Sequence, residues 1–350
     1  MGVIDVGVLG ATGMVGQQFL RLLDGHPLFR AAWLAASERS EGKRYRDAAT
    51  WRLAGPIPPA AADAGMEACV PGKGPQLVFS ALDARAADEL EPAFAAAGHT
   101  VVSNARSFRM QDDVPLLIPE INPEHLALID VQRRARGWRG AIVTNPNCST
   151  VVLAMALAPL RQFGIRTVLT TTLQAVSGAG YPGVPSYDIV GNVIPGIGGE
   201  EEKIESEANK ILGELRGERV AMHPAIVSAH TTRVPVIDGH TLTVSIAFER
   251  QPDVAAIASA LESWRGRPQH LSLPSAPPAP IEVEREGLRP QPRLDVDRGR
   301  GMTITVGRIR PCPVLGMKFV AMGHNTIRGA AGAAILNAEL MHADGWLELD

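Results

Sequence analysis

The feature that most constrains the fold lies near the start of the chain. An almost uncharged run at residues 3–9 leads into a glycine-rich turn and then into an apolar-periodic segment at residues 15–23. This order of strand, turn and helix is typical of a βαβ unit that binds a dinucleotide. Glycines in such a turn let the backbone approach a pyrophosphate at the helix N-terminus. The spacing here is GxxGxxG rather than GxGxxG, so a tight turn without a ligand is the alternative. The four glycines are Gly7, Gly10, Gly13 and Gly16.

Later apolar runs extend this unit into a sheet. They contain almost no charge, which is typical of parallel strands covered on both faces. A helix over residues 84–97, closed by Gly98, separates two of them. The sequence therefore predicts an α/β, Rossmann-like N-terminal domain. Its further strands are expected at residues 31–36, 77–82, 100–103 and 141–143.

Polar residues follow two of these strands, at the edge where open α/β sheets bind ligands. The loop at residues 104–110 contains Arg106 and Arg109, each of which can bind an anion or form an ordinary surface ion pair. After the second strand come Arg39 and Lys43, with Ser37 and Ser40, which can hold a 2′-phosphate, so we expect NADP. A solvated charged loop is the alternative. Glu38 in the same loop can serve the ribose diol of NAD instead.

Cys148 lies in the sequence TNPNCST at residues 144–150, between an apolar run and a buried helical segment. Asn, Pro and Ser at this junction are residues that begin helices. The unpaired N–H groups and the dipole of a helix start stabilise a thiolate, and the thiolate is the nucleophilic form. Cys148 is therefore a candidate for covalent catalysis. A small buried cysteine that packs as a hydrophobe is the alternative.

The second half of the chain has a different pattern. Residues 166–175 alternate and are rich in β-branched side chains, and further strand-like runs follow with few helices between them. This pattern predicts a mixed or antiparallel sheet in an α+β C-terminal domain. A helix is expected from Glu200 to about residue 215, and another over residues 325–340. The Pro- and Arg-rich residues 265–300 are expected to form loops, as an arm at a subunit interface.

Composition excludes several classes of function. A formal net charge of −3 argues against a non-specific nucleic-acid binder, and no apolar run is long enough to cross a membrane. The first residues enter a strand without a basic leader, so we expect no secretory signal. Three scattered cysteines are too few for a disulfide framework or a structural zinc site. We therefore expect a cytoplasmic enzyme without a metal.

Several stretches together resemble the aspartate-β-semialdehyde dehydrogenases of the archaeal and fungal branch. They occur in the family's order and cover nearly the whole chain. The resemblance implies an NADP-dependent enzyme in which a Cys forms a thioester while aspartyl phosphate is reduced to the semialdehyde. The stretches are GATGMVGQ, SNARSFRM, VPLLIPEINPEHL, TNPNCST, LQAVSGAGYPGV, IPGIGGEEEKIESE, HTTRVPVIDGH and NTIRGAAGAAILNAE.

The resemblance implies a role for each matching residue. Cys148 matches the nucleophile, and Gln174 matches a residue that orients the substrate. His240 matches the acid/base, which takes the thiol proton and manages protons on the hemithioacetal oxygen. Arg233 matches the Arg that holds the distal carboxylate of the substrate, and Glu200 an acid that pairs with its amino group. The phosphate is held by cations with two amides nearby, and these positions correspond to Arg109, Lys203, Asn104 and Asn147.

The resemblance also implies a cofactor site and a domain division. The cofactor-binding positions are Gly10, Thr12, Gly13, Met14, Val15, Ser37, Arg39, Ser40, Ser80, Ser177, Gly178 and Asn325. His324 stands where many relatives have Asp, next to that Asn. Residues 1–147 with 325–350 form the predicted NADP-binding domain, and residues 148–324 the predicted catalytic and dimerisation domain.

Two alternatives remain open at this point. A malonyl-CoA reductase of the same branch would use the same Cys and His on a thioester, and would bind no amino group. A non-catalytic NADP-binding sensor would keep only the fold, and the presence of Cys148, His240 and Arg233 together argues against it. The expected partners are a small-molecule substrate and further copies of the chain, in a homodimer or homotetramer.

Overall fold

A parallel sheet forms the first half of the molecule. The computed structural model describes residues 2–347 and contains a six-stranded sheet with strand order β3-β2-β1-β4-β5-β6, in which every neighbouring pair is parallel. This sheet is the predicted Rossmann-like architecture. Its strands are β1 (Ile4–Leu9), β2 (Phe29–Ala36), β3 (Met66–Ala68), β4 (Leu77–Ser80), β5 (Thr100–Ser103) and β6 (Ala141–Thr144).

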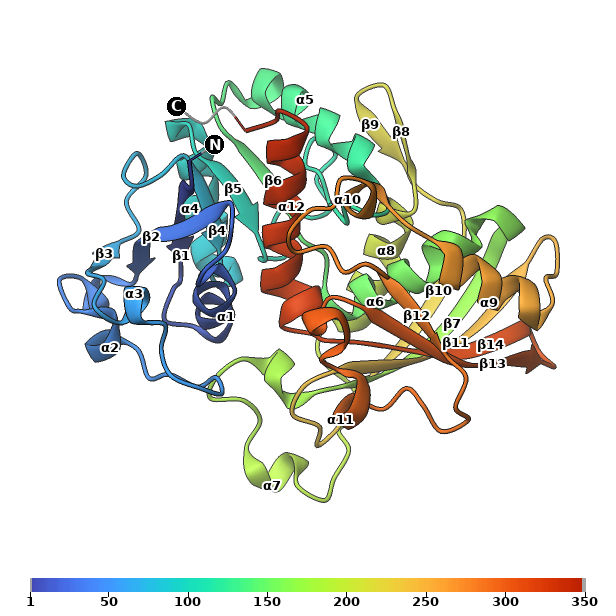
Figure 1. Ribbon diagram of the computed structural model, residues 1–350. Helices are drawn as coiled ribbons and strands as arrows, with labels where there is room; N and C mark the ends of the chain where they lie inside the picture. The colour runs from blue at the N-terminus through green and yellow to red at the C-terminus, as the bar shows by residue number, and fades with distance from the viewer. Residues whose placement is uncertain (1, 348–350) are drawn as a thin grey trace.

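Helices from both ends of the chain cover this sheet. The longer ones are α1 (Met14–Leu23), α4 (Ala84–Ala97), α5 (Leu128–Arg136) and, from the end of the chain, α12 (Gly332–Ala343). In Figure 1, α12 lies between the two halves of the molecule. Its Ile335, Leu336 and Leu340 share one buried core with Val6 and Phe79 of the first sheet. The short helices α2 (Tyr45–Ala48) and α3 (Pro59–Ala62) lie in the long connection between β2 and β3.

The glycine turn after β1 needs glycine for two distinct reasons. Gly10 has a φ of 74°, which a side chain rarely adopts, and a Cβ there would lie 2.7 Å from the carbonyl oxygen of Ala81. Gly16 has ordinary helical geometry, but a Cβ would lie 2.3 Å from the carbonyl oxygen of Gly10. The turn and the first turn of α1 are therefore in close backbone contact, which brings the N-terminus of α1 to the edge of the sheet.

The second half contains a mixed sheet, as the alternating pattern predicts. Its strand order is β10-β7-β11-β14-β13-β12, with parallel pairing at both edges and antiparallel pairing in the middle. One face packs against the helices α6 (Cys148–Leu157), α8 (Glu200–Ile211) and α9 (Val254–Ser263) in a single core. The strands are β7 (Ile165–Gln174), β10 (Ile226–Arg233), β11 (His240–Phe248), β12 (Ile281–Glu284), β13 (Ile304–Cys312) and β14 (Gly316–Gly323).

The structure differs from the predictions mainly in residues 265–323. The segment at 265–300 is not an arm, because it packs on the body of the protein: Leu273, Ile281 and Asp295 in it are buried. It contains β12 and the short helices α10 (Arg267–His270) and α11 (Pro292–Asp295). The segment that projects from the body in Figure 1 is instead the one around α7 (Ser186–Ile189).

Smaller differences concern the ends of elements. α8 ends at Ile211 rather than near residue 215, because the hairpin β8 (Glu214–Arg216) and β9 (Arg219–Ala221) follows at once. The helix expected over residues 325–340 begins with a π-helical turn, Ile327–Ala331, before α12. The domain division at residues 147 and 324 stays a prediction.

Candidate active site

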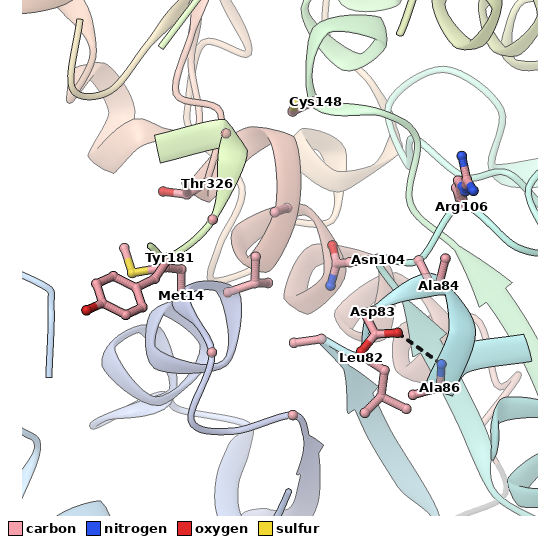
Figure 2. A pocket seen from close by; sticks show the side chains of 18 of the residues that line it. Met14, Leu82, Asp83, Ala84, Ala86, Asn104, Arg106, Cys148, Tyr181 and Thr326 are labelled. Carbon is pink, nitrogen blue, oxygen red and sulfur yellow. Dashed lines mark hydrogen bonds between the residues drawn. The ribbon is translucent and has the colours of Figure 1, made fainter. Parts of the chain in front are cut away.

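A cleft of about 1140 Å³ opens between the two sheets. Figure 2 shows that α1 contributes Met14 to it, the start of α4 contributes Asp83 and Ala84, and the start of α6 contributes Cys148. The loop after β7 adds Ser177 and Gly178. Both halves of the molecule therefore supply one continuous site, with the predicted dinucleotide-binding turn and the predicted nucleophile on its walls.

Cys148 is the first residue of α6, as predicted. Asn147 is the N-cap, and its Oδ1 accepts hydrogen bonds from the backbone N–H groups of Ser149 at 2.9 Å and Thr150 at 3.2 Å. Capping in this way fixes the first turn of the helix and aligns its dipole with the thiol. The Sγ atom lies in the cleft wall.

His240 begins β11 and faces the thiol. Its Nε2 lies 3.2 Å from Sγ of Cys148. Its Nδ1 accepts a hydrogen bond of 3.1 Å from the backbone N–H of Ala175. A neutral imidazole carries one proton, so this contact assigns the proton to Nε2, which then donates toward the sulfur. The backbone after β7 thus selects the tautomer of His240.

Burial keeps both members of this pair uncharged in the free protein. It raises the pKa of the Cys148 thiol to about 12, with the carboxylate of Glu200 adding to the rise while Arg109 and Arg233 oppose it. Burial likewise lowers the pKa of His240 to about 3, with Arg233 and His324 contributing. Ionisation of the thiol is therefore favoured only by positive charge beside it, and Arg109 and Arg233 are the cations that lower its pKa.

Arg233 and Gln174 come from neighbouring strand ends. They are paired in the register between β10 and β7, so both point to the same side of the sheet. Nη1 of Arg233 donates to the carbonyl oxygen of Ala175 at 2.7 Å. Both residues line the cleft, and a Cβ on Gly178 would lie 3.0 Å from Nη1 of Arg233 and 3.2 Å from Nε2 of His240. The guanidinium, the imidazole and the loop after β7 are thus closely packed.

Glu200 and Lys203 lie on the first turn of α8. Nζ of Lys203 is 2.6 Å from Oε1 of Glu200, and Nδ2 of Asn147 donates to Oε2 of the same carboxylate at 2.7 Å. Burial alone would raise the pKa of Glu200, but the bonds from Lys203, Asn147 and Gln174 lower it below its ordinary value. The carboxylate therefore stays charged beside the nucleophile.

Arg109 and Asn104 reach the cleft from the loop after β5. Nη2 of Arg109 donates to the carbonyl oxygen of Asn104 at 2.8 Å, and Nη1 forms an ion pair of 3.0 Å with Glu207. Asn104 donates to the carbonyl oxygen of Ser80 at 3.1 Å and accepts from Asn145 at 2.8 Å. The structure thus brings Arg109, Lys203, Asn104 and Asn147 to the same cleft.

Most of the predicted cofactor residues line the same cleft, namely Gly10, Thr12, Gly13, Met14, Val15, Ser37, Ser177, Gly178 and Asn325. Asn325 joins the two halves, because its Nδ2 donates to Oγ of Ser177 at 2.8 Å and its Oδ1 accepts from the backbone of Gly239 at 2.8 Å. Glu38 also lines the cleft.

Three predicted cofactor residues do not line it. Arg39 is exposed beside the lining pair Ser37 and Glu38. Ser40 is buried behind them, in the short turn Glu38–Ser40. Ser80 is fully buried at the end of β4, beneath the floor of the cleft.

Sequence reasoning missed several residues of the site. The cleft is also lined by the start of α4, by Tyr181, and by Thr326 and Gly329 at the π-helical turn before α12. The guanidinium of Arg52 lies 4.1 Å from the centre of the Tyr181 ring, so this contact crosses between the two halves. The position of α4 after a strand end was a usable signal, whereas nothing in the sequence pairs Arg52 with Tyr181.

Residues 2–347 contain neither a metal cluster nor a membrane-spanning helix. No group of three or more His, Cys, Asp and Glu side chains in this range is arranged to hold a metal ion. No helix in the same range is long and apolar enough to span a membrane.

A Rossmann-like domain that shares one cleft with a Cys–His pair on a second domain defines a dinucleotide-dependent oxidoreductase with a thiol nucleophile. Family models agree with this class. Residues 5–129 match the model described as "Semialdehyde dehydrogenase, NAD binding domain", and residues 157–328 match "Semialdehyde dehydrogenase, dimerisation domain".

Individual relatives narrow the class further. The chain is 53% identical to the aspartate-semialdehyde dehydrogenase of Archaeoglobus fulgidus, over 96% of this chain and 97% of that protein. It is 50% identical to that of Methanothermobacter thermautotrophicus, over 97% and 99%. A crystal structure of the Candida albicans enzyme with NADP matches with a TM-score of 0.90 at 42% identity, over 99% and 100%. The chain belongs to the aspartate-semialdehyde dehydrogenase family.

Proposed function

We propose that the chain catalyses the reduction of L-4-aspartyl phosphate to L-aspartate 4-semialdehyde and phosphate, with NADPH as the reductant, in the aspartate pathway of lysine, threonine and methionine biosynthesis. The observation that carries this proposal is the contact of 3.2 Å between Sγ of Cys148 and Nε2 of His240, in a cleft shared with a dinucleotide-binding turn. Relatives named for this activity cover nearly the whole chain.

The chemistry begins with Cys148. In the biosynthetic direction the thiolate attacks the acyl carbon, a C–S bond forms, and the C–O bond to phosphate breaks, which leaves a thioester and releases phosphate. Bound NADPH supplies the hydride that reduces this thioester. The resulting hemithioacetal oxygen carries negative charge until the C–S bond breaks. This oxygen then becomes the aldehyde carbonyl, and Cys148 leaves as the thiolate.

His240 is placed to stabilise that oxygen. Because Nδ1 accepts from Ala175, the proton on Nε2 points toward the reacting centre and can be donated to the hemithioacetal oxygen. The expectation that His240 also takes the thiol proton requires the other tautomer, in which Nδ1 bears the proton and the bond from Ala175 is lost. The observed contacts favour donation from Nε2.

The two ends of the substrate are assigned to different groups. Arg233 binds the distal carboxylate, since a planar guanidinium matches a carboxylate in a bidentate manner. Glu200 binds the amino group, and its low pKa supports this role because a charged carboxylate attracts an ammonium. Gln174 orients the substrate between them. Phosphate is held by Arg109 and Lys203, with Asn104 and Asn147 beside them.

The cofactor half of the cleft fits a pyrophosphate. Gly13 is the N-cap of α1, and no side chain caps that helix start, so its first backbone N–H groups are available to an anion. At the adenosine end, Ser37 lines the cleft and supports a 2′-phosphate, whereas Arg39 would have to turn inward to reach it. The Candida albicans relative was crystallised with NADP, which supports the same choice for this chain.

The alternatives are less well supported. Malonyl-CoA offers no ammonium for Glu200, and the three relatives are all named aspartate-semialdehyde dehydrogenase. A non-catalytic sensor would not require the contact between Cys148 and His240.

Assembly into a homodimer or homotetramer is part of the proposal. The face of the second sheet away from α6 and α8 exposes Leu169, Leu173 and Ile226, and the matching family model is described as a dimerisation domain. A cytoplasmic location is proposed because all three cysteines are free thiols, and the catalytic one must stay reduced.

The test is spectrophotometric. Purified protein is mixed with aspartate semialdehyde, phosphate and NADP, and formation of NADPH is followed, with malonyl-CoA plus NADPH as the competing substrate. Cys148→Ala should abolish turnover while leaving NADP binding nearly intact. Residual activity above about a thousandth of wild type would contradict covalent catalysis, because loss of a nucleophile usually costs more. Cys69→Ala and Cys312→Ala serve as matched controls and should remain active.

A further inference from the structure

One face of α8 carries four charged residues in succession. Glu200, Lys203, Glu207 and Lys210 are separated by three, four and three positions, so they lie on the same side of the helix. The first pair lines the cleft, as described above. Glu207 and Lys210 lie two to three turns further along and are 2% and 3% exposed. Charged groups this deeply buried require hydrogen-bond partners. The partners of Glu207 and Lys210 lie in the loop after β5 and at the start of α6.

The carboxylate of Glu207 divides its two oxygens between two such segments. Oε1 accepts from Nη1 of Arg109 at 3.0 Å, and Oε2 accepts from the backbone N–H of Asn147 at 2.6 Å. Asn147 immediately precedes the nucleophile and caps its helix. A single buried carboxylate therefore connects a cation of the phosphate site to the backbone that places Cys148.

Lys210 holds the other side of the same loop. Its Nζ donates to the backbone carbonyl oxygens of Arg109 at 2.8 Å, Gln111 at 2.7 Å and Val114 at 2.9 Å. An ammonium has three donors, and all three are used here. Lys210 thus fixes the backbone of the loop, which leaves Glu207 to fix the charged end of Arg109.

The guanidinium of Arg109 has five N–H donors, of which the hydrogen bonds to Glu207 and Asn104 use two. Nη1 bonds Glu207 and Nη2 bonds the carbonyl oxygen of Asn104, whereas the buried Nε has no hydrogen-bond partner among residues 2–347. Arg109 lines the cleft, so its unused N–H donors can bind a phosphate oxygen. The orientation of the guanidinium depends on its ion pair with Glu207.

We propose that Glu207 is a positioning residue for phosphate, acting through its ion pair with Arg109. The inference rests on the proposed function, because it assigns Arg109 to the phosphate of that reaction. Glu207 does not touch the reacting atoms. It holds the guanidinium of Arg109 in one orientation relative to Cys148. Phosphate is thereby held in one position relative to the acyl carbon, both when it leaves in the biosynthetic direction and when it attacks in the reverse direction.

The test is Glu207→Gln, which keeps the shape of the side chain and removes its charge. We expect the KM for phosphate in the semialdehyde-oxidising direction to rise roughly tenfold, the effect of weakening one charge-assisted hydrogen bond. The KM values for semialdehyde and NADP should stay within about twofold, because Arg233 and the α1 turn are not contacted. Glu202→Gln, on the exposed side of the same helix, is the matched control and should change none of these constants.

A double-mutant cycle distinguishes positioning from general structural support. Arg109→Ala alone should raise the phosphate KM, and adding Glu207→Gln in that background should raise it no further, since the residue acts through Arg109. Additive effects would overturn the proposal. A lower phosphate KM in Glu207→Gln would also overturn it, because Glu207 would then compete with phosphate for Arg109. Thermal unfolding monitors the fold, and Glu207→Asp, which keeps the charge, is expected to shift the KM in the same direction if the Gln variant does not fold.

The failure of this inference is distinct from failure of the proposed function. If wild-type protein does not oxidise the semialdehyde in a phosphate-dependent manner, both proposals fail before any variant is made. An active wild type with an unchanged phosphate KM in Glu207→Gln removes only the role of Glu207.

Discussion

Replacing Arg233 with Lys tests how the substrate's carboxylate is recognised. In the structure the carbonyl oxygen of Ala175 accepts a hydrogen bond from Nη1 of Arg233, so the substrate must be bound by the remaining N–H groups of the guanidinium. A lysine keeps the positive charge but has one nitrogen, which cannot reproduce both contacts in a fixed plane. Arg233 is 6% exposed, so water does not readily replace a lost contact.

The expected magnitude follows from one lost charge-assisted hydrogen bond, which is worth about 1.5–3 kcal/mol. Since about 1.4 kcal/mol corresponds to a factor of ten, kcat/KM for the semialdehyde should fall roughly ten- to a hundredfold. The KM for phosphate should change little, because phosphate is assigned to Arg109 and Lys203. Lys203→Ala should have the opposite profile and raise the phosphate KM most.

Steady-state kinetics, with each substrate varied in turn at saturating levels of the others, measures both profiles. If Arg233→Lys raises the phosphate KM and spares the semialdehyde, the two anion sites have been assigned the wrong way round. If it alters both equally, the variant has disturbed the Cys148–His240 pair, and the reasoning about separate sites fails.

Three further predictions follow from the walls of the cleft. Wild-type protein should use NADP with a higher kcat/KM than NAD. Arg39→Ala should narrow this difference in kcat/KM, and Glu38→Ala should widen it. Equal kcat/KM values for the two cofactors in wild type would indicate that Glu38 holds the ribose diol. Gly178→Ala should lower kcat roughly ten- to a hundredfold with little change in unfolding temperature, because its Cβ would lie 3.1 Å from the His240 ring; Gly198→Ala, where a Cβ meets nothing within 4 Å, is the control. Because burial raises the pKa of Cys148 to about 12, its alkylation by iodoacetamide in the free protein should accelerate about tenfold per pH unit between roughly pH 7 and 9, and a plateau in that range would contradict the raised pKa.

Several elements of the first domain were predicted from the sequence because local chemistry marks them, whereas β3 and α5 were not predicted. The helix Ala84–Ala97 was predicted to the residue, since Asp83 caps its start and Gly98, with a φ of 108°, ends it. β14 was missed because its sequence, GMKFVAMG, has a glycine at each end and a lysine inside, and its pairing with β11 and β13 is not encoded locally. β12 was missed because it lies in a Pro-rich stretch where no periodicity is visible.

The site was predicted in its chemistry but not in its geometry. Cys148 was marked by its helix start, whereas its contact with His240 joins residues 92 positions apart and was implied only by the family resemblance. Glu207 was missed for a related reason. The sequence of α8 is EEEKIESEANKI, and helical periodicity alone does not say which of its glutamates meets an arginine from the other half of the protein. Long-range packing decides that choice.

The return of α12 to the first sheet has a consequence for synthesis of the protein. Ile335, Leu336 and Leu340 are part of the same hydrophobic core as Val6 and Phe79, so the cofactor half cannot complete its core until the last segment leaves the ribosome. The buried ion pair between Arg328 and Glu120 imposes the same delay. A fragment ending at residue 147 would expose apolar surface and bind chaperones or aggregate. The cofactor half therefore completes its core only after α12 has been translated.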